Sequence, residues 1–118
     1  MRTLTALPVY NEGAHIQGVL EGALFYSREV LVVDDGSTDA TPQILAARND
    51  IHVIRHPHNL GYGAAVRSAF QFAIANNYDT LVTIDCDGQH QPQMIPAFVR
   101  AAAAADVVSG SRYLGRRS

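Results

Sequence analysis

The sequence predicts an α/β fold in which helices cover both faces of a mostly parallel β-sheet. Short apolar segments alternate with helix-like segments along the 118 residues. Repeated strand–helix–strand units form right-handed crossovers, which produce a parallel sheet. A chain of this length has the size of one domain, and no linker or internal repeat divides the sequence. We therefore expect a single domain over residues 1–118.

The predicted strands are short and rich in β-branched residues. They are apolar at consecutive positions, which is typical of strands that are covered on both faces of a sheet. The segments are residues 4–9, 30–33, 51–54, 81–84 and 106–108.

Helices are predicted between the strands, because apolar residues recur there at three- and four-residue steps. The first spans about residues 13–25, the third spans residues 63–76, and a fourth includes residues 94–99. The second carries Pro42 in its first turn, with Asp39 or Thr41 as its cap. The pattern stops after the fifth strand, which indicates either an incomplete domain or an uncovered sheet edge that self-association completes.

The composition excludes several classes of protein. All nine basic residues are arginine, so there is no lysine for a Schiff base, a P-loop or the acidic pocket of a receiver domain. A net charge of −2 argues against nucleic-acid binding. The single Cys86 excludes an internal disulfide and a cysteine zinc cluster. No signal peptide or bilayer-length apolar stretch is recognisable, so we expect a soluble, cytoplasmic chain.

Acidic residues follow the predicted strands at the edge where parallel sheets bind ligands. Ligands lie beyond the carboxyl ends of such strands, because every loop there points the same way. The segments that follow the first, second, fourth and fifth strands are residues 8–12, 34–39, 85–90 and 109–112. Carboxylates that converge on one edge repel one another unless a cation or a hydrogen-bond donor compensates. The sequence therefore predicts a ligand site at this edge.

Asp85 and Asp87 are candidate metal ligands at the end of the fourth strand. With Gln89 they offer hard oxygen atoms, which suit Mg²⁺ or Mn²⁺ better than zinc. Such an ion keeps open positions for phosphate oxygens, so its natural partner is a nucleoside diphosphate ester. The alternative is a turn that ends a strand. The neighbouring acidic loops favour the metal.

The Asp34–Asp35 pair has two interpretations. In the first, Gly36 makes a turn, and Ser37, Thr38 or Asp39 caps the following helix. In the second, one of the two carboxylates faces the cleft and accepts hydrogen bonds from a nucleobase or a ribose. Capping alone does not account for two successive carboxylates at the end of a buried strand.

Other polar residues also keep two interpretations. Tyr10 either stacks on a base or covers the core, and Glu12 either caps the first helix or binds the nucleotide. His56 and His58 are spaced to chelate a metal, but no third ligand is near them in the sequence. His90 either contacts an acceptor phosphate or orients the metal loop.

Five motifs span nearly the whole chain, at residues 8–12, 32–39, 59–65, 85–92 and 110–113. Together, and in this order, they resemble family 2 glycosyltransferases of GT-A fold, in their amino-terminal, nucleotide-binding half. Among these the chain is most similar to polyprenyl (dolichyl) phosphate mannose or glucose synthases.

The resemblance implies a role for each matching residue. The nucleoside would be held by Pro8, Tyr10, Glu12, Val33 and Asp35. Asp85 and Asp87 would be the catalytic residues and, with Gln89, would hold the metal and the diphosphate, with Cys86 contributing its backbone. Arg112 would approach the donor phosphates or the sugar.

The resemblance also implies a reaction. Family members transfer a hexose from a nucleotide donor, here GDP-mannose or a UDP-sugar, with inversion at the anomeric carbon. The implied acceptor is a polyprenyl phosphate or a glycan, and the full-length protein would lie at the cytoplasmic face of a membrane. The alternative function is binding of a nucleotide sugar and a metal without catalysis.

Overall fold

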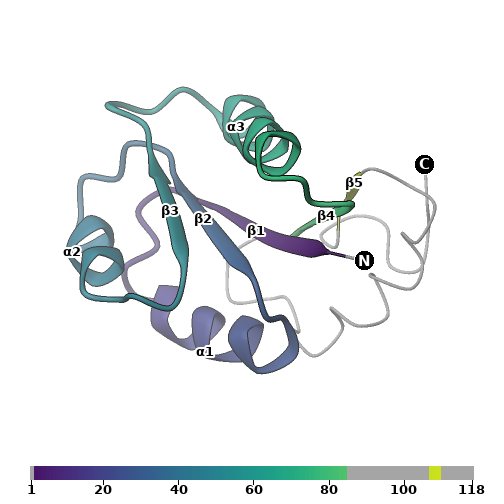
Figure 1. The fold of residues 1–118 in the computed structure, drawn as a ribbon. Coiled ribbons are helices and arrows are strands. Elements are labelled where there is room, and N and C mark those ends of the chain that lie inside the picture. The colour runs from purple at the N-terminus through teal and green to yellow at the C-terminus, as the bar shows by residue number, and fades with distance from the viewer. Residues whose placement is uncertain (1, 85–106, 110–118) are drawn as a thin grey trace.

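A computed structural model of the chain describes residues 2–84 and 107–109. It contains a five-stranded, fully parallel sheet in the order β3-β2-β1-β4-β5 (Figure 1). The chain moves outward from β1 to β2 and β3, then returns to the other side of β1, so the winding direction changes between β1 and β4. The strands are β1 (Thr3–Val9), β2 (Val30–Asp34), β3 (His52–Arg55), β4 (Thr80–Thr83) and β5 (Val107–Ser109).

Helices cover both faces of the sheet, which confirms the predicted fold class. The helices α1 (Ile16–Tyr26) and α2 (Thr41–Ala46) lie on one face, and α3 (Tyr62–Ala75) lies on the other (Figure 1). The predicted fourth helix, residues 94–99, lies outside the described residues. Among residues 2–84 and 107–109, no helix has the length and apolar character needed to cross a membrane.

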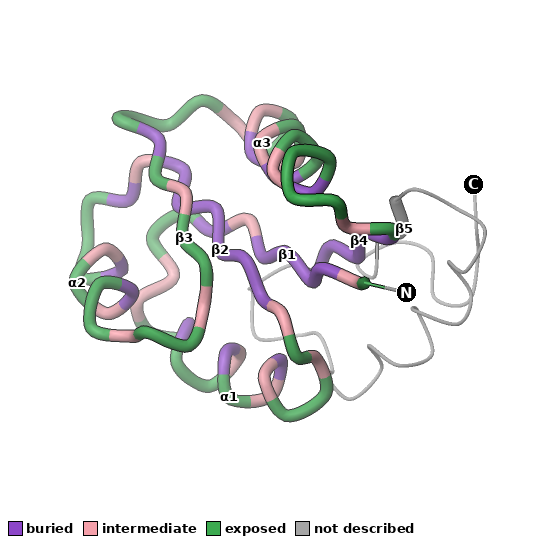
Figure 2. Tube along the Cα trace, in the orientation of Figure 1, coloured by how far each residue is buried: buried purple, intermediate pink, exposed green. Residues whose placement is uncertain are grey.

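The core consists of two apolar layers, one on each side of the central strands (Figure 2). Alternate residues of a strand point to opposite faces. Accordingly Val32 packs in the layer under α1 and α2, whereas Val33 packs in the layer under α3. The helix α3 contributes mainly small residues to its layer, namely Ala65, Ala69 and Ala73. Their lack of bulk permits a close approach of α3 to the sheet.

The edge strand β3 differs from the prediction. A strand covered on both faces was expected at residues 51–54, but the strand runs from His52 to Arg55 and is largely exposed. It pairs with β2 on one side, and no described strand pairs with its other side. Because β3 is an edge, only Ile54 of its four residues is partly covered.

The helix α1 begins at Ile16, three residues later than predicted. Residues 13–15 form a turn in place of the first helical turn, after Asn11, whose backbone is left-handed with φ of 54°. The carbonyl of Glu12 then accepts hydrogen bonds from the N–H groups of His15 and Ile16, and this turn leads into the helix.

The helix α2 has Ala40 at its N-cap position instead of Asp39 or Thr41. Asp39 still satisfies a free helix donor, because its Oδ1 accepts a hydrogen bond from the N–H of Thr41 at 2.9 Å.

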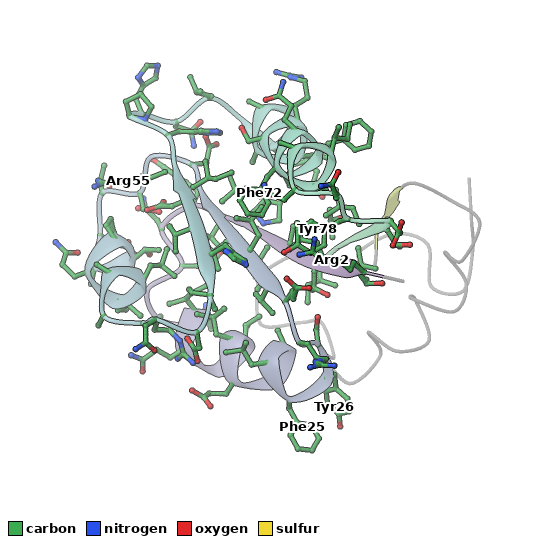
Figure 3. The ribbon with its side chains drawn as sticks, in the orientation of Figure 1. Arg2, Phe25, Tyr26, Arg55, Phe72 and Tyr78 are labelled. Atoms are coloured by element: carbon green, nitrogen blue, oxygen red, sulfur yellow. The ribbon has the colours of Figure 1, made fainter. Side chains whose placement is uncertain are left out.

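The amino ends of the strands are closed by a cluster around Arg2 (Figure 3). The Arg2 guanidinium lies 4.2 Å from the centre of the Tyr78 ring and donates to Glu29 at 3.2 Å. The Tyr78 hydroxyl donates to the same Glu29 oxygen at 2.5 Å. Tyr78 and then Arg2 thereby lower the pKa of Glu29. Asp79 accepts a hydrogen bond from the Arg2 backbone, so the carboxylates here are paired with partners from the chain itself.

Replacement of Leu20 by alanine is expected to destabilise the fold strongly. Leu20 is fully buried in the layer beneath α1, and such truncations cost about 2–5 kcal/mol. Leu60→Ala is the matched control, because the Leu60 side chain is 49% exposed and surface changes cost about 0.5 kcal/mol or less. Urea unfolding measures both variants, and equal free energies of unfolding would contradict the assigned core.

Candidate functional site

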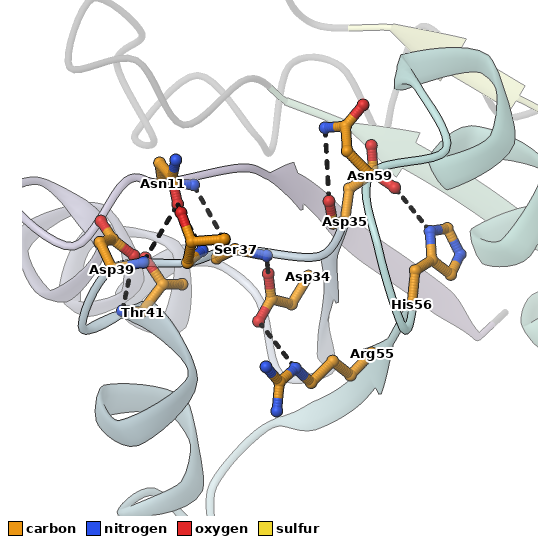
Figure 4. A network of polar contacts seen from close by, with 10 residues as sticks. Asn11, Asp34, Asp35, Ser37, Asp39, Thr41, Arg55, His56 and Asn59 are labelled. Atoms are coloured by element: carbon orange, nitrogen blue, oxygen red, sulfur yellow. Dashed lines mark hydrogen bonds and ion pairs between the residues drawn. The ribbon is translucent and has the colours of Figure 1, made fainter.

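Three loops meet at the edge of the sheet where the strands end, called here the carboxyl edge. The first loop is residues 10–15 after β1, the second is residues 35–40 after β2, and the third is residues 56–61 after β3. Figure 4 shows the polar contacts that join them. Most of the described residues predicted to bind a nucleotide lie in or beside the first two loops.

Asp34 and Asp35 point to opposite sides of the sheet because they are consecutive residues at a strand end. Asp34 lies on the α2 side and is fully buried. Its Oδ1 accepts the Ser37 N–H at 3.0 Å, which forms the turn that Gly36 permits with φ of 78°. Its Oδ2 lies 3.8 Å from the Arg55 Nε and accepts no hydrogen bond from any described residue.

Asp35 is only 4% exposed and binds the third loop. Its Oδ1 accepts hydrogen bonds from the ring Nδ1 of His56 at 2.7 Å and from the Leu60 N–H at 2.9 Å. Its Oδ2 accepts the Gly61 N–H at 2.9 Å. Burial by itself raises the pKa of this carboxyl, but these donors outweigh burial and the pKa is lowered. The carboxylate is therefore held in its charged form.

Asn11 joins the first loop to the second. Its N–H donates to the Ser37 hydroxyl at 2.9 Å, and its side-chain oxygen accepts the Thr38 N–H at 2.7 Å and the Asp39 N–H at 3.2 Å. Of the four predicted capping residues, only Asp39 bonds a helix N–H with its side chain, and its other oxygen accepts the Gly13 N–H at 3.0 Å. The polar residues of the second loop thus mainly bind the first loop.

The third loop lies directly against the turn of the second. A Cβ atom added to Gly36 would meet the His58 carbonyl carbon at 2.3 Å and the Asn59 nitrogen at 2.5 Å. The Asn59 side chain also donates to the Asp35 carbonyl at 3.4 Å. Gly36 therefore serves two needs, because it supplies a left-handed turn and leaves space for a neighbouring backbone.

The residues predicted to hold a nucleoside differ in how far they are exposed. Pro8 is half-buried at the end of β1 and lies opposite Val33 in the parallel register. Val33 is fully buried in the core. Tyr10 is 45% exposed at the carboxyl edge, so its ring is open to a ligand. Glu12 is half-buried, and its Oε1 lies 3.2 Å from the His15 ring.

The predicted residues of the fourth and fifth loops lie outside the described residues. They are Asp85, Cys86, Asp87, Gln89, His90 and Arg112. The last described residue before the fourth loop is Ile84, which donates a hydrogen bond to the Ala6 carbonyl of β1. The described chain before Asp85 therefore ends beside β1, at the carboxyl edge. Residues 2–84 and 107–109 contain no group of three or more metal-binding side chains.

The contact that sequence reasoning missed is made by His56. It was considered only as a metal ligand paired with His58, yet it is buried against Asp35 and Ser68. His58 is exposed. The available signal was position, since His56 follows β3 just as Asp35 follows its parallel neighbour β2.

Gly36→Ala is expected to lower the free energy of unfolding by about 2 kcal/mol or more, because it combines left-handed strain with a backbone clash. Gly18→Ala is the matched control. Gly18 lies within α1 and an added Cβ there would meet nothing within 4 Å, so a gain of about 0.5–1 kcal/mol is expected. Chemical denaturation of both variants tests this, and a harmless Gly36→Ala would contradict the close loop packing.

The lowered pKa of Asp35 predicts a loss of stability in acid. A carboxyl whose pKa is lower in the folded chain stabilises it fully above the unfolded pKa of about 4, and this contribution is lost as the pH falls through the folded pKa. Unfolding curves measured from pH 7 down to about pH 3 should therefore fall more steeply for the natural chain than for Asp35→Asn. Parallel curves would show that Asp35 contributes nothing to the acid response.

Comparison with known proteins gives consistent matches. Residues 5–118 match the domain described as glycosyl transferase family 2. The chain is 39% identical to an undecaprenyl-phosphate mannosyltransferase of Micrococcus luteus, over 95% of this chain and 49% of that protein. It is 34% identical to a polyprenol monophosphomannose synthase of Mycolicibacterium smegmatis, over 96% of this chain and 46% of that protein. It is 33% identical to a dolichol-phosphate mannosyltransferase of Pyrococcus furiosus, over 97% of this chain and 34% of that protein.

The chain therefore spans about half the length, or less, of these relatives. The domain match covers the whole described sheet and its three loops. It confirms the resemblance seen in the sequence motifs, and the parallel α/β sheet agrees with that family's fold. The chain belongs to glycosyl transferase family 2.

Proposed function

We propose that the protein transfers a hexose from a nucleoside diphosphate donor to a polyprenyl phosphate. The observation that carries this proposal is the similarity to relatives named for that chemistry, at 39% and 34% identity over nearly the whole chain. GDP-mannose is the first donor to test, and a UDP-sugar is the second. Because a polyprenyl phosphate is a membrane lipid and the donor is a water-soluble nucleotide sugar, the full-length protein is proposed to act at the cytoplasmic face of a membrane.

The nucleoside is proposed to lie over the carboxyl ends of β1 and β2. Pro8 and the exposed ring of Tyr10 border this position, and aromatic rings stack well on bases. Glu12 belongs to the same loop as Tyr10 and is half-buried, and it is proposed to contact the ribose. Val33 and Asp35 are buried, so their proposed part is to shape the floor and hold the neighbouring loop.

Asp85, Asp87 and Gln89 are proposed to hold Mg²⁺ or Mn²⁺, because their oxygen atoms suit a hard cation. When bound, the ion would neutralise charge on the leaving diphosphate. Asp87 is the principal candidate ligand. Arg112 supplies a second positive charge for the donor phosphates, and Cys86 contributes only its backbone.

The proposed transfer is a single displacement. An oxygen of the acceptor phosphate attacks the anomeric carbon, a new carbon–oxygen bond forms, and the bond to the nucleoside diphosphate breaks with inversion. The acceptor oxygen is already ionised at neutral pH, so no strong protein base is required. The contribution of the chain is to position the donor and to stabilise the charge that develops on the diphosphate.

A second candidate is donor binding without transfer, and one observation favours it. Among the described residues, the carboxyl edge offers the exposed Tyr10 side chain to a nucleoside, and none has been assigned to an acceptor. A glycan acceptor is a further alternative within the family. Sugar transfer to a polyprenyl phosphate, followed with a labelled GDP-mannose or UDP-glucose, separates these candidates from the proposed reaction.

The binding site is tested by calorimetric titration with GDP and UDP, each with and without Mn²⁺. We expect one nucleotide to bind more tightly when the metal is present. Asp87→Ala should abolish that metal-dependent gain and leave the fold intact. Asp50→Ala is the matched control, because Asp50 is exposed, pairs with Arg48 and precedes β3 at the opposite edge. Equal metal dependence in the Asp87→Ala variant and the natural chain would contradict the metal assignment.

A further inference from the structure

We propose that His56 is a positioning residue for nucleotide binding, because it holds the Asp35 carboxylate and, through it, the third loop. This inference rests on the proposed function, since it assumes that a nucleotide binds at the carboxyl edge. His56 itself is 7% exposed and is not proposed to touch the ligand.

His56 connects three elements that are far apart in the sequence. Its Nδ1 lies 2.7 Å from Asp35 Oδ1 after β2, and its Nε2 lies 2.8 Å from the Ser68 hydroxyl on α3. An ionised carboxylate only accepts hydrogen bonds, so Nδ1 carries the proton and donates it to Asp35. The ring therefore ties β2 and α3 to the end of β3, which is one of the two edge strands of the described sheet.

The Asp35 carboxylate is already occupied by the chain. Three donors reach its two oxygens, from the His56 ring and from the Leu60 and Gly61 N–H groups. A carboxylate with so many donors and so little exposure has little capacity left for a ligand. Asp35 thus acts chiefly on the third loop, and His56 supplies the only side-chain donor among these three.

The position of the third loop depends on its hydrogen bonds to the Asp35 carboxylate. Its other described contacts with the second loop are the backbone packing on Gly36 and the longer bond from Asn59 to the Asp35 carbonyl. Gly61, at the start of α3, has φ of 103°, a conformation that glycine adopts readily. Leu60 near the end of the loop and Tyr62 at the start of α3 are both about half-exposed. Loss of the His56 bond would therefore loosen the third loop and its packing on the turn of the second loop, which borders the proposed nucleotide site.

The order Asp35–His56–Ser68 also resembles a nucleophilic triad, but the position of Ser68 argues against that role. Ser68 lies inside α3, where backbone N–H groups are used by the helix itself. Those groups are not available to stabilise an oxyanion. The bond to Ser68 therefore orients the ring.

Two replacements of His56 test the roles of its two ring nitrogens separately. Asparagine places an amide donor near the position of Nδ1, which can still reach Asp35, whereas glutamine reaches toward the position of Nε2 and Ser68. His52→Ala is the matched control, because His52 is an exposed histidine at the start of the same strand. Each variant, and His56→Ala, is measured for GDP and UDP affinity and for hydrogen exchange of the Leu60 and Gly61 amides without nucleotide.

We expect His56→Ala and His56→Gln to weaken nucleotide binding by about tenfold, which matches the loss of one hydrogen bond to a charged group. Both should also speed exchange of the two amides. His56→Asn and His52→Ala should stay close to the natural chain in both measurements.

Three outcomes would count against the proposals, and they differ. A folded His56→Ala chain with natural affinity would overturn the role of His56. If that variant does not fold, equal nucleotide affinity of the glutamine and asparagine variants would overturn it instead. Failure of the natural chain to bind either nucleotide would contradict the proposed function, while the amide exchange would still report whether His56 anchors the loop.

Discussion

The buried carboxylate of Asp35 determines how the carboxyl edge is built. A charged group with 4% exposure is costly unless donors surround it, and here the donors come from the loop after the neighbouring strand. Satisfying this charge therefore fixes the third loop against the second. Gly36 is required beside it, because any larger residue would push the same two loops apart.

The two ends of the strands, the carboxyl edge and the opposite amino edge, satisfy their polar groups in different ways. At the amino edge, Arg2, Glu29 and Tyr78 bind one another in a local cluster. At the carboxyl edge, each loop binds its neighbour: Asn11 joins the first loop to the second, and Asp35 joins the second to the third. Linked loops of this kind are suited to hold a ligand in a fixed geometry, because little ordering is left to occur on binding.

The fold was predictable from the sequence because its signals are local. Runs of apolar residues marked the parallel strands, and small residues at helical spacing marked the buried face of α3. The prediction failed at β3, where a short apolar run was taken for a covered strand although His52 and Arg55 already indicated an edge. The start of α1 was also missed, since the spacing of apolar residues does not mark the turn at residues 13–15 that precedes Ile16.

The candidate site was predictable only in part. Motifs identified the loops, and strand alternation separates Asp34 from Asp35. The bond between Asp35 and His56 was missed because the two residues are 21 positions apart. The only signal for it was positional, since each residue follows one of the two neighbouring parallel strands β2 and β3. Likewise, nothing in the sequence showed that Ser37 would bind the first loop instead of a helix end. The metal role of Asp85, Asp87 and Gln89 stays a prediction.

The central claim is that a nucleotide binds across the first and second loops. The most direct test is a titration of the isotope-labelled chain with GDP or UDP and Mg²⁺, followed by amide chemical shifts. The account predicts the largest changes at Tyr10, Asn11 and Gly36, with little change at Glu29 and Tyr78. Saturable changes that concentrate at the amino edge, with the carboxyl edge unaffected, would contradict it.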